Sequence, residues 1–172
     1  MKNAKTAAWI SDGGTGFWGT YQKNFSSILG ILDFYHAAQY LWKFAKIWLD
    51  GRTASAKQWF PSARSLLRSG DVAAISYSID PEKILQSDTE SELRKSYNNL
   101  SSYLLQHIEH VDYHHFKSLG LPIGSGMVES SCKWLIQHRF KGSGMRWSFS
   151  GFDHLLSLRL AWVNQRFDQL FS

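Results

Sequence analysis

The sequence predicts an α/β fold in which helices predominate, and three observations lead to that prediction. Residues 6–11 form a short apolar run followed by Asp-Gly-Gly, which is typical of a strand that enters a turn. Residues 28–32 form a second apolar run, which ends at Asp33. From Phe34 onward, apolar residues recur at helical spacing in several long stretches. Two short strands are therefore expected near the start of the chain, and a long helical block is expected after the second one.

The first helices follow from apolar side chains that share one face. A helix is expected over residues 16–25, where aromatic residues recur every four positions. Residues 34–49 carry a broad apolar stripe, and Asp50-Gly51 should end that helix. The stripe consists of Ala37, Tyr40, Leu41, Phe44, Ile47 and Trp48. Further helices are expected over 53–69, 81–86 and 89–109.

The last part of the chain is framed by glycines. Residues 120–126 read Gly-Leu-Pro-Ile-Gly-Ser-Gly and predict a loop. A helix is expected over 127–140, and the Lys-Gly-Ser-Gly at 141–144 should break it. A final helix is expected from about 151 to 170. The organisation divides into a sheet segment at 1–33, a helical block at 34–118 and a glycine-framed helical part at 119–172.

Composition favours a globular protein with an anionic partner. The chain has 172 residues, of which 44% are hydrophobic and 19% charged, so it can bury a core and is not of the disordered class. Its formal charge is +5, and the basic residues are unevenly placed. Between Lys133 and Arg166 there are six basic residues and one acidic residue, Asp153.

Other features bear on the compartment. A single cysteine, Cys132, excludes an intrachain disulfide framework and fits a reducing environment. No apolar run reaches the length of a membrane span, and the start shows no signal-peptide pattern. We therefore expect a soluble, cytoplasmic protein without a membrane partner.

Three acidic segments suggest one metal site. Asp12 ends the first strand beside two glycines, Asp33 and His36 form an Asp-x-x-His, and Glu129 opens a helix after Gly-Ser-Gly. Mg²⁺ prefers a few carboxylates together with the phosphates of its substrate. Two such ions can clamp the attacking and leaving oxygens of a phosphoryl displacement.

Each of these residues also has a plain structural explanation. Asp12 can serve an Asp-Gly turn. Asp33 can cap the helix at 34–49, with His36 at the edge of the core. Glu129 can favour the dipole of its helix. The sequence alone leaves both explanations open.

A basic segment with interleaved aromatic residues follows Glu129. Such a pattern suits a nucleic-acid backbone and unstacked bases, although a solvated basic face over buried aromatic residues is equally consistent with it. The residues proposed for DNA binding are Lys133, Arg139, Lys141, Arg146 and Trp147.

Two further chemistries have weaker support. Histidines 107, 110, 114 and 115 crowd one segment as a zinc site would, but their spacing matches no strong template. Cys132 with a distant histidine suggests a nucleophile pair, without local support.

Several blocks together resemble one known family. They are Ser11-Asp12-Gly13, ILDFYHAA at 31–38, GLPIGSGMVESSCK at 120–133, GSGMRW at 142–147 and Arg166-Phe167-Asp168. In this order they resemble the C-terminal part of a DDE transposase from bacterial insertion sequences, of the Mutator-like superfamily and closest to its Kra group.

The resemblance implies an RNase H-like fold with an all-helical insertion, here residues 34–118. It assigns Asp12 as the second catalytic aspartate and Glu129 as the closing glutamate, both ligands of Mg²⁺ or Mn²⁺. Asp33 and His36 match the signature that follows the second aspartate. The implied activity is DNA transposition, with cleavage at transposon ends and joining to target DNA by a homo-oligomer at the bacterial nucleoid.

The chain departs from the family at its start. The family's first catalytic aspartate lies on an earlier strand, yet none of the eleven residues before Asp12 is acidic. The chain is therefore expected to be a truncated transposase or part of an interrupted reading frame, with little catalytic activity by itself. The alternative function is a non-catalytic, DNA-binding or regulatory remnant.

Overall fold

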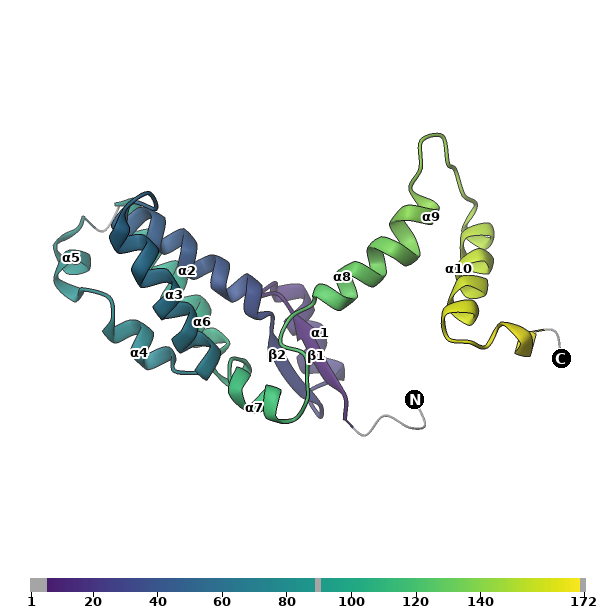
Figure 1. Cartoon of the computed structure of the whole chain (residues 1–172), viewed down its shortest axis with the longest axis horizontal. Coiled ribbons are helices and arrows are strands. Elements are labelled where there is room, and N and C mark those ends of the chain that lie inside the picture. The colour runs from purple at the N-terminus through teal and green to yellow at the C-terminus, as the bar shows by residue number, and fades with distance from the viewer. Residues whose placement is uncertain (1–5, 89–90, 171–172) are drawn as a thin grey trace. The chain divides into compact units, whose positions relative to one another are not determined.

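The computed structural model describes residues 6–88 and 91–170. The chain divides into two compact units, Met1–Ser125 and Gly126–Ser172. The first unit contains the sheet and helices α1 to α7, and the second contains α8 to α10 (Figure 1). The described fold is thus predominantly helical, as the sequence predicts, and its small sheet is parallel. Among the described residues, no helix is both long and apolar enough to cross a lipid bilayer.

Two short strands joined by a helix form a βαβ unit. Strand β1 (Ala8–Ser11) pairs in parallel with β2 (Leu29–Leu32), and α1 (Thr15–Asn24) connects them. Parallel neighbours need a crossover connection, which this helix supplies. Trp18 and Tyr21 are the buried side chains of α1.

The helical block is built around one long helix, α2 (Phe34–Leu49), which packs against α3 and α6. The other elements are α3 (Ala54–Ser69), α4 (Val72–Tyr77), α5 (Pro81–Gln86), α6 (Glu92–Gln106), the 3₁₀ turn η1 (Ile108–His110) and α7 (Tyr113–Ser118). The predicted stripe of α2 supplies Ala37, Leu41 and Phe44 to the core, each fully buried.

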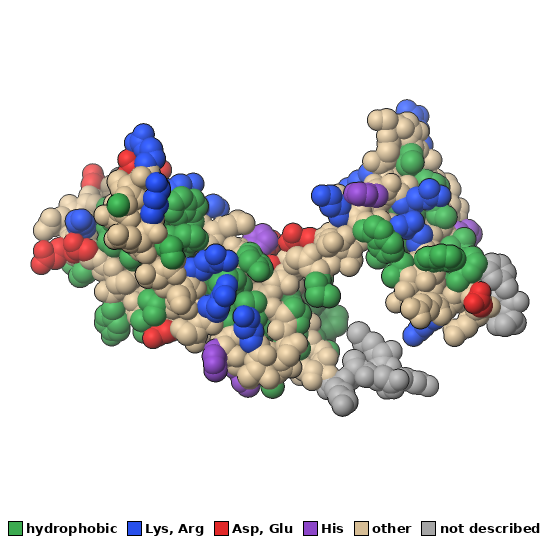
Figure 2. All heavy atoms as spheres, in the orientation of Figure 1, with side chains coloured by type: hydrophobic (Ala, Val, Ile, Leu, Met, Phe, Trp, Pro, Cys, Tyr) green, Lys and Arg blue, Asp and Glu red, His purple; other side chains and the backbone are tan. Residues whose placement is uncertain are grey.

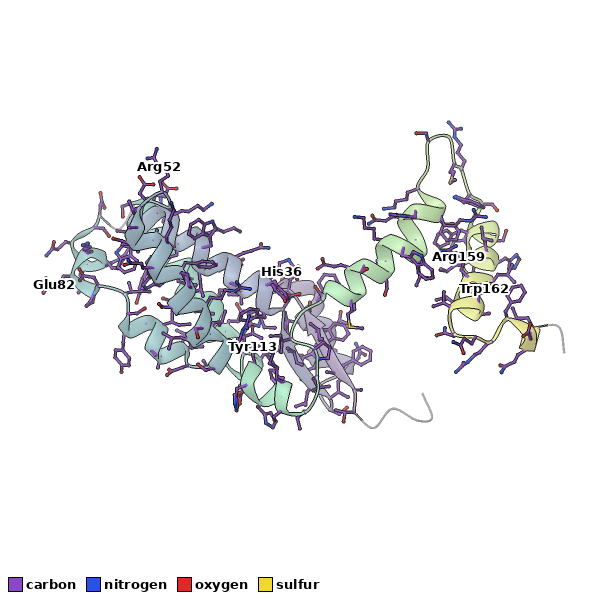
Figure 3. All side chains as sticks on the ribbon, viewed as in Figure 1. His36, Arg52, Glu82, Tyr113, Arg159 and Trp162 are labelled. Atoms are coloured by element: carbon purple, nitrogen blue, oxygen red, sulfur yellow. The ribbon has the colours of Figure 1, made fainter. Side chains whose placement is uncertain are left out.

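The second unit has a small aromatic core. It consists of α8 (Gly126–Cys132), the π-helical segment η2 (Lys133–Gln137), α9 (His138–Phe140), α10 (Phe149–Val163) and the 3₁₀ turn η3 (Phe167–Leu170). The ring of buried Phe140 contacts the rings of Trp147 and Phe152. The guanidinium of Arg159 stacks over the Trp134 ring, and Figure 3 labels Arg159 on α10.

The structure departs from the sequence prediction at short or terminal elements. Helices α4 and α7 were not predicted, and each begins at an aspartate whose side chain accepts a backbone N–H. The final helix ends at Val163 rather than near 170, because Gln165 adopts a positive φ of 55° that no helix continues through.

Two histidines, His107 and the partly buried His110, connect the sheet to the helical block. The rings of His107 and His110 lie against Trp18, and His110 Nδ1 lies 3.1 Å from the Gly30 carbonyl oxygen. A carbonyl can only accept, so this nitrogen carries a proton. Burial lowers the pKa of both histidines, more than their hydrogen bonds to backbone carbonyls raise it.

These pKa shifts predict stability that depends on pH. The unfolded chain binds protons at these histidines below a pH of about 6.5, where the folded chain still holds them neutral. The free energy of unfolding should therefore fall as the pH drops from 7.5 to 5.5, measured by urea denaturation. His110→Asn, which keeps a donor but does not titrate, should reduce this slope, whereas the exposed control His114→Asn should not. A slope that is the same in all three proteins contradicts the assignment.

Candidate functional site at the carboxyl edge of the sheet

Two aspartates lie side by side because the strands are parallel. Ser11 of β1 pairs with Leu32 of β2, so Asp12 and Asp33 both follow directly at the carboxyl ends. The Asp33 N–H extends the ladder by donating to the Ser11 carbonyl oxygen at 2.8 Å. In open α/β sheets this edge is where ligands bind.

Asp12 forms the predicted turn through one carboxylate oxygen, and its other oxygen is available as a ligand. Its Oδ1 accepts the Gly14 N–H at 3.0 Å, and its carbonyl accepts the indole N–H of Trp18 at 2.6 Å. Its side chain is half-buried. Among the described residues no donor contacts Oδ2, so this oxygen can take another ligand. The structural and functional explanations of Asp12 are therefore compatible.

Asp33 caps α2, as the sequence predicts, and it also binds a distant loop. Its Oδ1 accepts the N–H groups of Tyr35 at 2.7 Å and His36 at 3.1 Å. Its Oδ2 accepts the Ser125 N–H at 2.7 Å and the Ser125 hydroxyl, across 92 positions of sequence. The carboxylate is 1% exposed. Four donors satisfy both oxygens, so its first role is to hold the backbone together.

These hydrogen bonds keep Asp33 ionised. Burial alone raises the pKa of its carboxyl, but the hydrogen bonds from Ser125, His36 and Tyr35 outweigh burial. The pKa therefore lies below its usual value. A permanently charged carboxylate can hold its four donors throughout the neutral pH range.

The loop before Ser125 fits closely against α2. The Phe34 N–H donates to the Ile123 carbonyl oxygen at 2.9 Å. A Cβ atom on Gly124 would lie 2.7 Å from Cδ2 of Tyr35, closer than side chains approach. Glycine at 124 thus allows Ser125 to reach Asp33.

His36 lies on the first turn of α2 (Figure 3). Its Nδ1 is 3.5 Å from Asp33 Oδ1, too long for a strong hydrogen bond. That nitrogen is buried without a hydrogen-bond partner among the described residues, while the side chain as a whole is 38% exposed. A buried ring nitrogen of this kind can accept a hydrogen bond or bind a metal ion.

The remaining predicted residues belong to the second unit. Glu129 lies in the first turn of α8. Lys133, Arg139, Lys141 and Arg146 are all exposed, and Figure 2 shows Lys and Arg side chains over this unit.

Trp147 already has packing partners. Its ring contacts Phe140, and its indole N–H donates to the Phe140 carbonyl oxygen at 3.1 Å. The side chain is nevertheless 41% exposed, so stacking on a base stays a prediction.

The structure does not support the histidine zinc site or the cysteine nucleophile pair. Among the described residues, histidines 107 to 115 do not form a group that could hold a metal ion. His107 is buried among aromatic rings, whereas His114 and His115 are exposed. Cys132 is a free, exposed thiol.

Sequence reasoning missed Ser125 as a partner of Asp33. The available signal was the Gly-Ser-Gly triplet, whose serine has the donors that a capping aspartate can accept. It also missed Tyr103, whose ring packs so closely on Gly13 that a Cβ there would lie 2.1 Å from Cε2.

Comparison with known proteins finds no match: no protein-family model, no curated protein and no solved structure is significantly similar to this chain. A function is therefore inferred from the geometry of the residues themselves.

The Asp33–Ser125 interaction predicts a specific loss of stability. Asp33→Ala should destabilise the fold more than Asp71→Ala, since Asp71 caps α4 by accepting only the Ala74 N–H. Loss of a cap costs about 0.5–2 kcal/mol in either variant. Asp33→Ala should cost a further 1.5–3 kcal/mol or so, because hydrogen bonds to a charged group are removed. Urea unfolding monitored by tryptophan fluorescence measures both.

Ser125→Ala provides the second test of this interaction. It should have a smaller effect than Asp33→Ala, because the Ser125 N–H is kept. Its effect should nearly vanish in the Asp33→Ala background. Equal losses for Asp33→Ala and Asp71→Ala contradict the role given to Ser125.

Proposed function

We propose that this chain is the C-terminal catalytic part of a DDE transposase, related to the Mutator-like family, with a partial RNase H-like fold. In this proposal it acts on DNA with Mg²⁺ or Mn²⁺, and the intact transposase is a homo-oligomer. Asp12 and Glu129 hold the ion, while Asp33 and His36 shape the site. The order of strand with Asp12, helix, parallel strand with Asp33, helical block and helix with Glu129 supports it.

The observation that carries the proposal is the binding of Ser125 to Asp33. It fixes the end of the 120–125 loop at the sheet edge that also bears Asp12. Helix α8 begins at the next residue, Gly126. Without this contact, no hydrogen bond to Asp33 would hold the end of the loop that leads to Glu129.

Chain length limits where Glu129 can lie. Glu129 is four positions after Ser125, and four fully extended residues span at most about 14 Å. In a helix, the rise from 126 to 129 is only about 5 Å. Glu129 is therefore within covalent reach of the edge that carries Asp12 and Asp33.

The residues fit a hard divalent cation. Asp12 offers Oδ2, and Glu129 offers a second carboxylate, the ligand type that Mg²⁺ prefers. Asp33 and His36 offer further ligand atoms, one of them an imidazole nitrogen. A set with nitrogen suits Mn²⁺ better than Mg²⁺. Because Asp33 already accepts four hydrogen bonds, we propose Asp12 and Glu129 as the main ligands.

The proposed chemistry is phosphodiester cleavage and strand transfer. A divalent ion bound there would stabilise the charge of the displaced and attacking oxygens. Asp12 and Glu129 would hold the ion that orients the substrate phosphate, and Ser125, bound to Asp33, ends the loop that leads into α8. The exposed basic residues after Glu129 would hold the DNA backbone.

A second candidate is a DNA-binding remnant that does not catalyse. The four hydrogen bonds of Asp33 favour it, since a carboxylate whose oxygens are already satisfied serves the fold rather than a metal. Metal binding separates the two candidates, because only the first requires Glu129 and Asp12 to bind an ion.

Metal binding should depend on Glu129. In a titration followed by Mn²⁺ electron paramagnetic resonance, Glu129→Gln should weaken binding at least tenfold, since one carboxylate ligand is removed. Asp12→Asn should do the same if Asp12 is the partner ligand, whereas His36→Ala should do so if the set with Asp33 is used. Glu109→Gln, an exposed acidic residue of the 3₁₀ turn, is the control. Equal affinity of wild type and Glu129→Gln would falsify the metal site.

DNA binding should depend on the basic segment. Replacing Arg139, Lys141 and Arg146 together with alanine should lower the affinity for duplex DNA and flatten its salt dependence, because fewer counterions are released. Fluorescence anisotropy at several salt concentrations measures this slope. The matched control is a triple replacement of Arg52, Lys57 and Lys83, exposed cations of the first unit. A slope unchanged by the first triple replacement contradicts the assignment of this segment.

A further inference from the structure

A groove runs along the first unit between α2 and α6. Its volume is about 900 Å³, at the upper end of the roughly 300–1,000 Å³ of ligand pockets. Residues from both helices line it, and Gly13 lies at one end. The main lining side chains are Tyr40, Lys43, Lys46, Lys95, Asn99 and Tyr103.

The groove carries positive charge. Lys43 and Lys46 come from α2, and Lys95 comes from α6. Among the described residues, Glu92 is the acidic side chain that lines the same groove, so lysines outnumber carboxylates there. This balance favours an anionic ligand. Ser96 and Asn99 add neutral hydrogen-bonding groups along the α6 side.

Aromatic rings form part of its wall. Tyr40 stacks on Tyr103 with ring centroids 3.9 Å apart and an angle of 10°. The Lys43 Nζ lies 5.0 Å from the Tyr40 centroid, which holds this cation at the groove. Cations beside aromatic rings are the combination that proteins use for single nucleic-acid strands.

The groove ends beside the candidate site. Gly13 follows Asp12 directly, and the Tyr103 ring packs on it too closely for any side chain at 13. A ligand lying along α2 and α6 would therefore reach the residue next to Asp12.

We infer that this groove binds the phosphodiester backbone of one DNA strand and leads that strand to Asp12. The inference rests on the proposed function, and it assigns a second DNA contact, separate from the basic segment after Glu129. Lys43, Lys46 and Lys95 contact successive phosphates, and Asn99 contacts sugar or base atoms. The tyrosine rings in the wall favour a single strand, whose unstacked bases can contact them, such as an end unpaired during cleavage.

The test measures the salt dependence of binding with the full chain. A fluorescent single-stranded DNA of twelve nucleotides is titrated by anisotropy in the presence of EDTA, so that no ion contributes. Lys43→Gln combined with Lys95→Gln should reduce the slope of log affinity against log salt by about 1.4, or about 0.7 for each phosphate that is no longer neutralised. The control pair Lys57→Gln with Lys83→Gln removes the same charge from exposed positions outside the groove. Equal reductions of the slope in both pairs overturn the inference.

Two further binding measurements, with a DNA duplex and with an RNA strand, identify the ligand. A duplex of the same length should be less affected by the groove variants than the single strand, and an equal effect on both overturns the strand assignment. An RNA strand shares the phosphate chemistry, and tighter binding of RNA than of DNA through the groove overturns the assignment to DNA. Unchanged melting temperatures show that the variants are folded.

Crosslinking locates the strand directly. Benzoylphenylalanine at Asn99 should crosslink to the DNA, while the same residue at Gln58, exposed on α3, should not. If the residue at position 99 does not crosslink to DNA while metal binding still depends on Glu129, the groove is rejected and the proposed function is kept. Crosslinking at Asn99 in a chain that binds no metal rejects the proposed catalytic function and leaves the groove in place.

Discussion

The buried carboxylate of Asp33 is the interaction on which the rest of the arrangement depends. It ends β2, caps α2 and accepts two hydrogen bonds from Ser125, so three segments meet at one charged group. The carboxylate is 1% exposed, and its charge is stabilised by all four donors. Removing it would take away the acceptor of the Tyr35, His36 and Ser125 N–H groups, which is more costly than the loss of an ordinary cap.

The same helix that starts at this carboxylate also shapes the groove. Helix α2 carries Asp33 at its N-cap, His36 in its first turn, and Tyr40, Lys43 and Lys46 further along. Helix α2 thus carries lining residues of the groove and, at its start, the two residues proposed to shape the cation site. Gly13 connects them, because it lies beside Asp12 and under Tyr103.

Much of the first unit could be predicted from sequence, because its signals are local. The bounds of α2, its cap at Asp33 and the two strands follow from periodicity and from the residue before the helix. The proximity of Asp12 and Asp33 follows once the strands are parallel. The pairing of Asp33 with Ser125 could not be predicted, since nothing in the local pattern at 33 points to position 125. The histidines at 107 and 110 suggested a metal, but burial against Trp18 makes them neutral packing residues instead.

The central claim is that one divalent ion is bound jointly by the sheet edge and the start of α8. Paramagnetic line broadening by Mn²⁺ in the ¹⁵N-labelled chain tests it most directly. At a small fraction of one equivalent, the amide signals of Gly13 and Gly14 and those of residues 127–130 should lose intensity together, and excess Mg²⁺ should restore both. Broadening of only one of these groups, or of neither, would contradict the account.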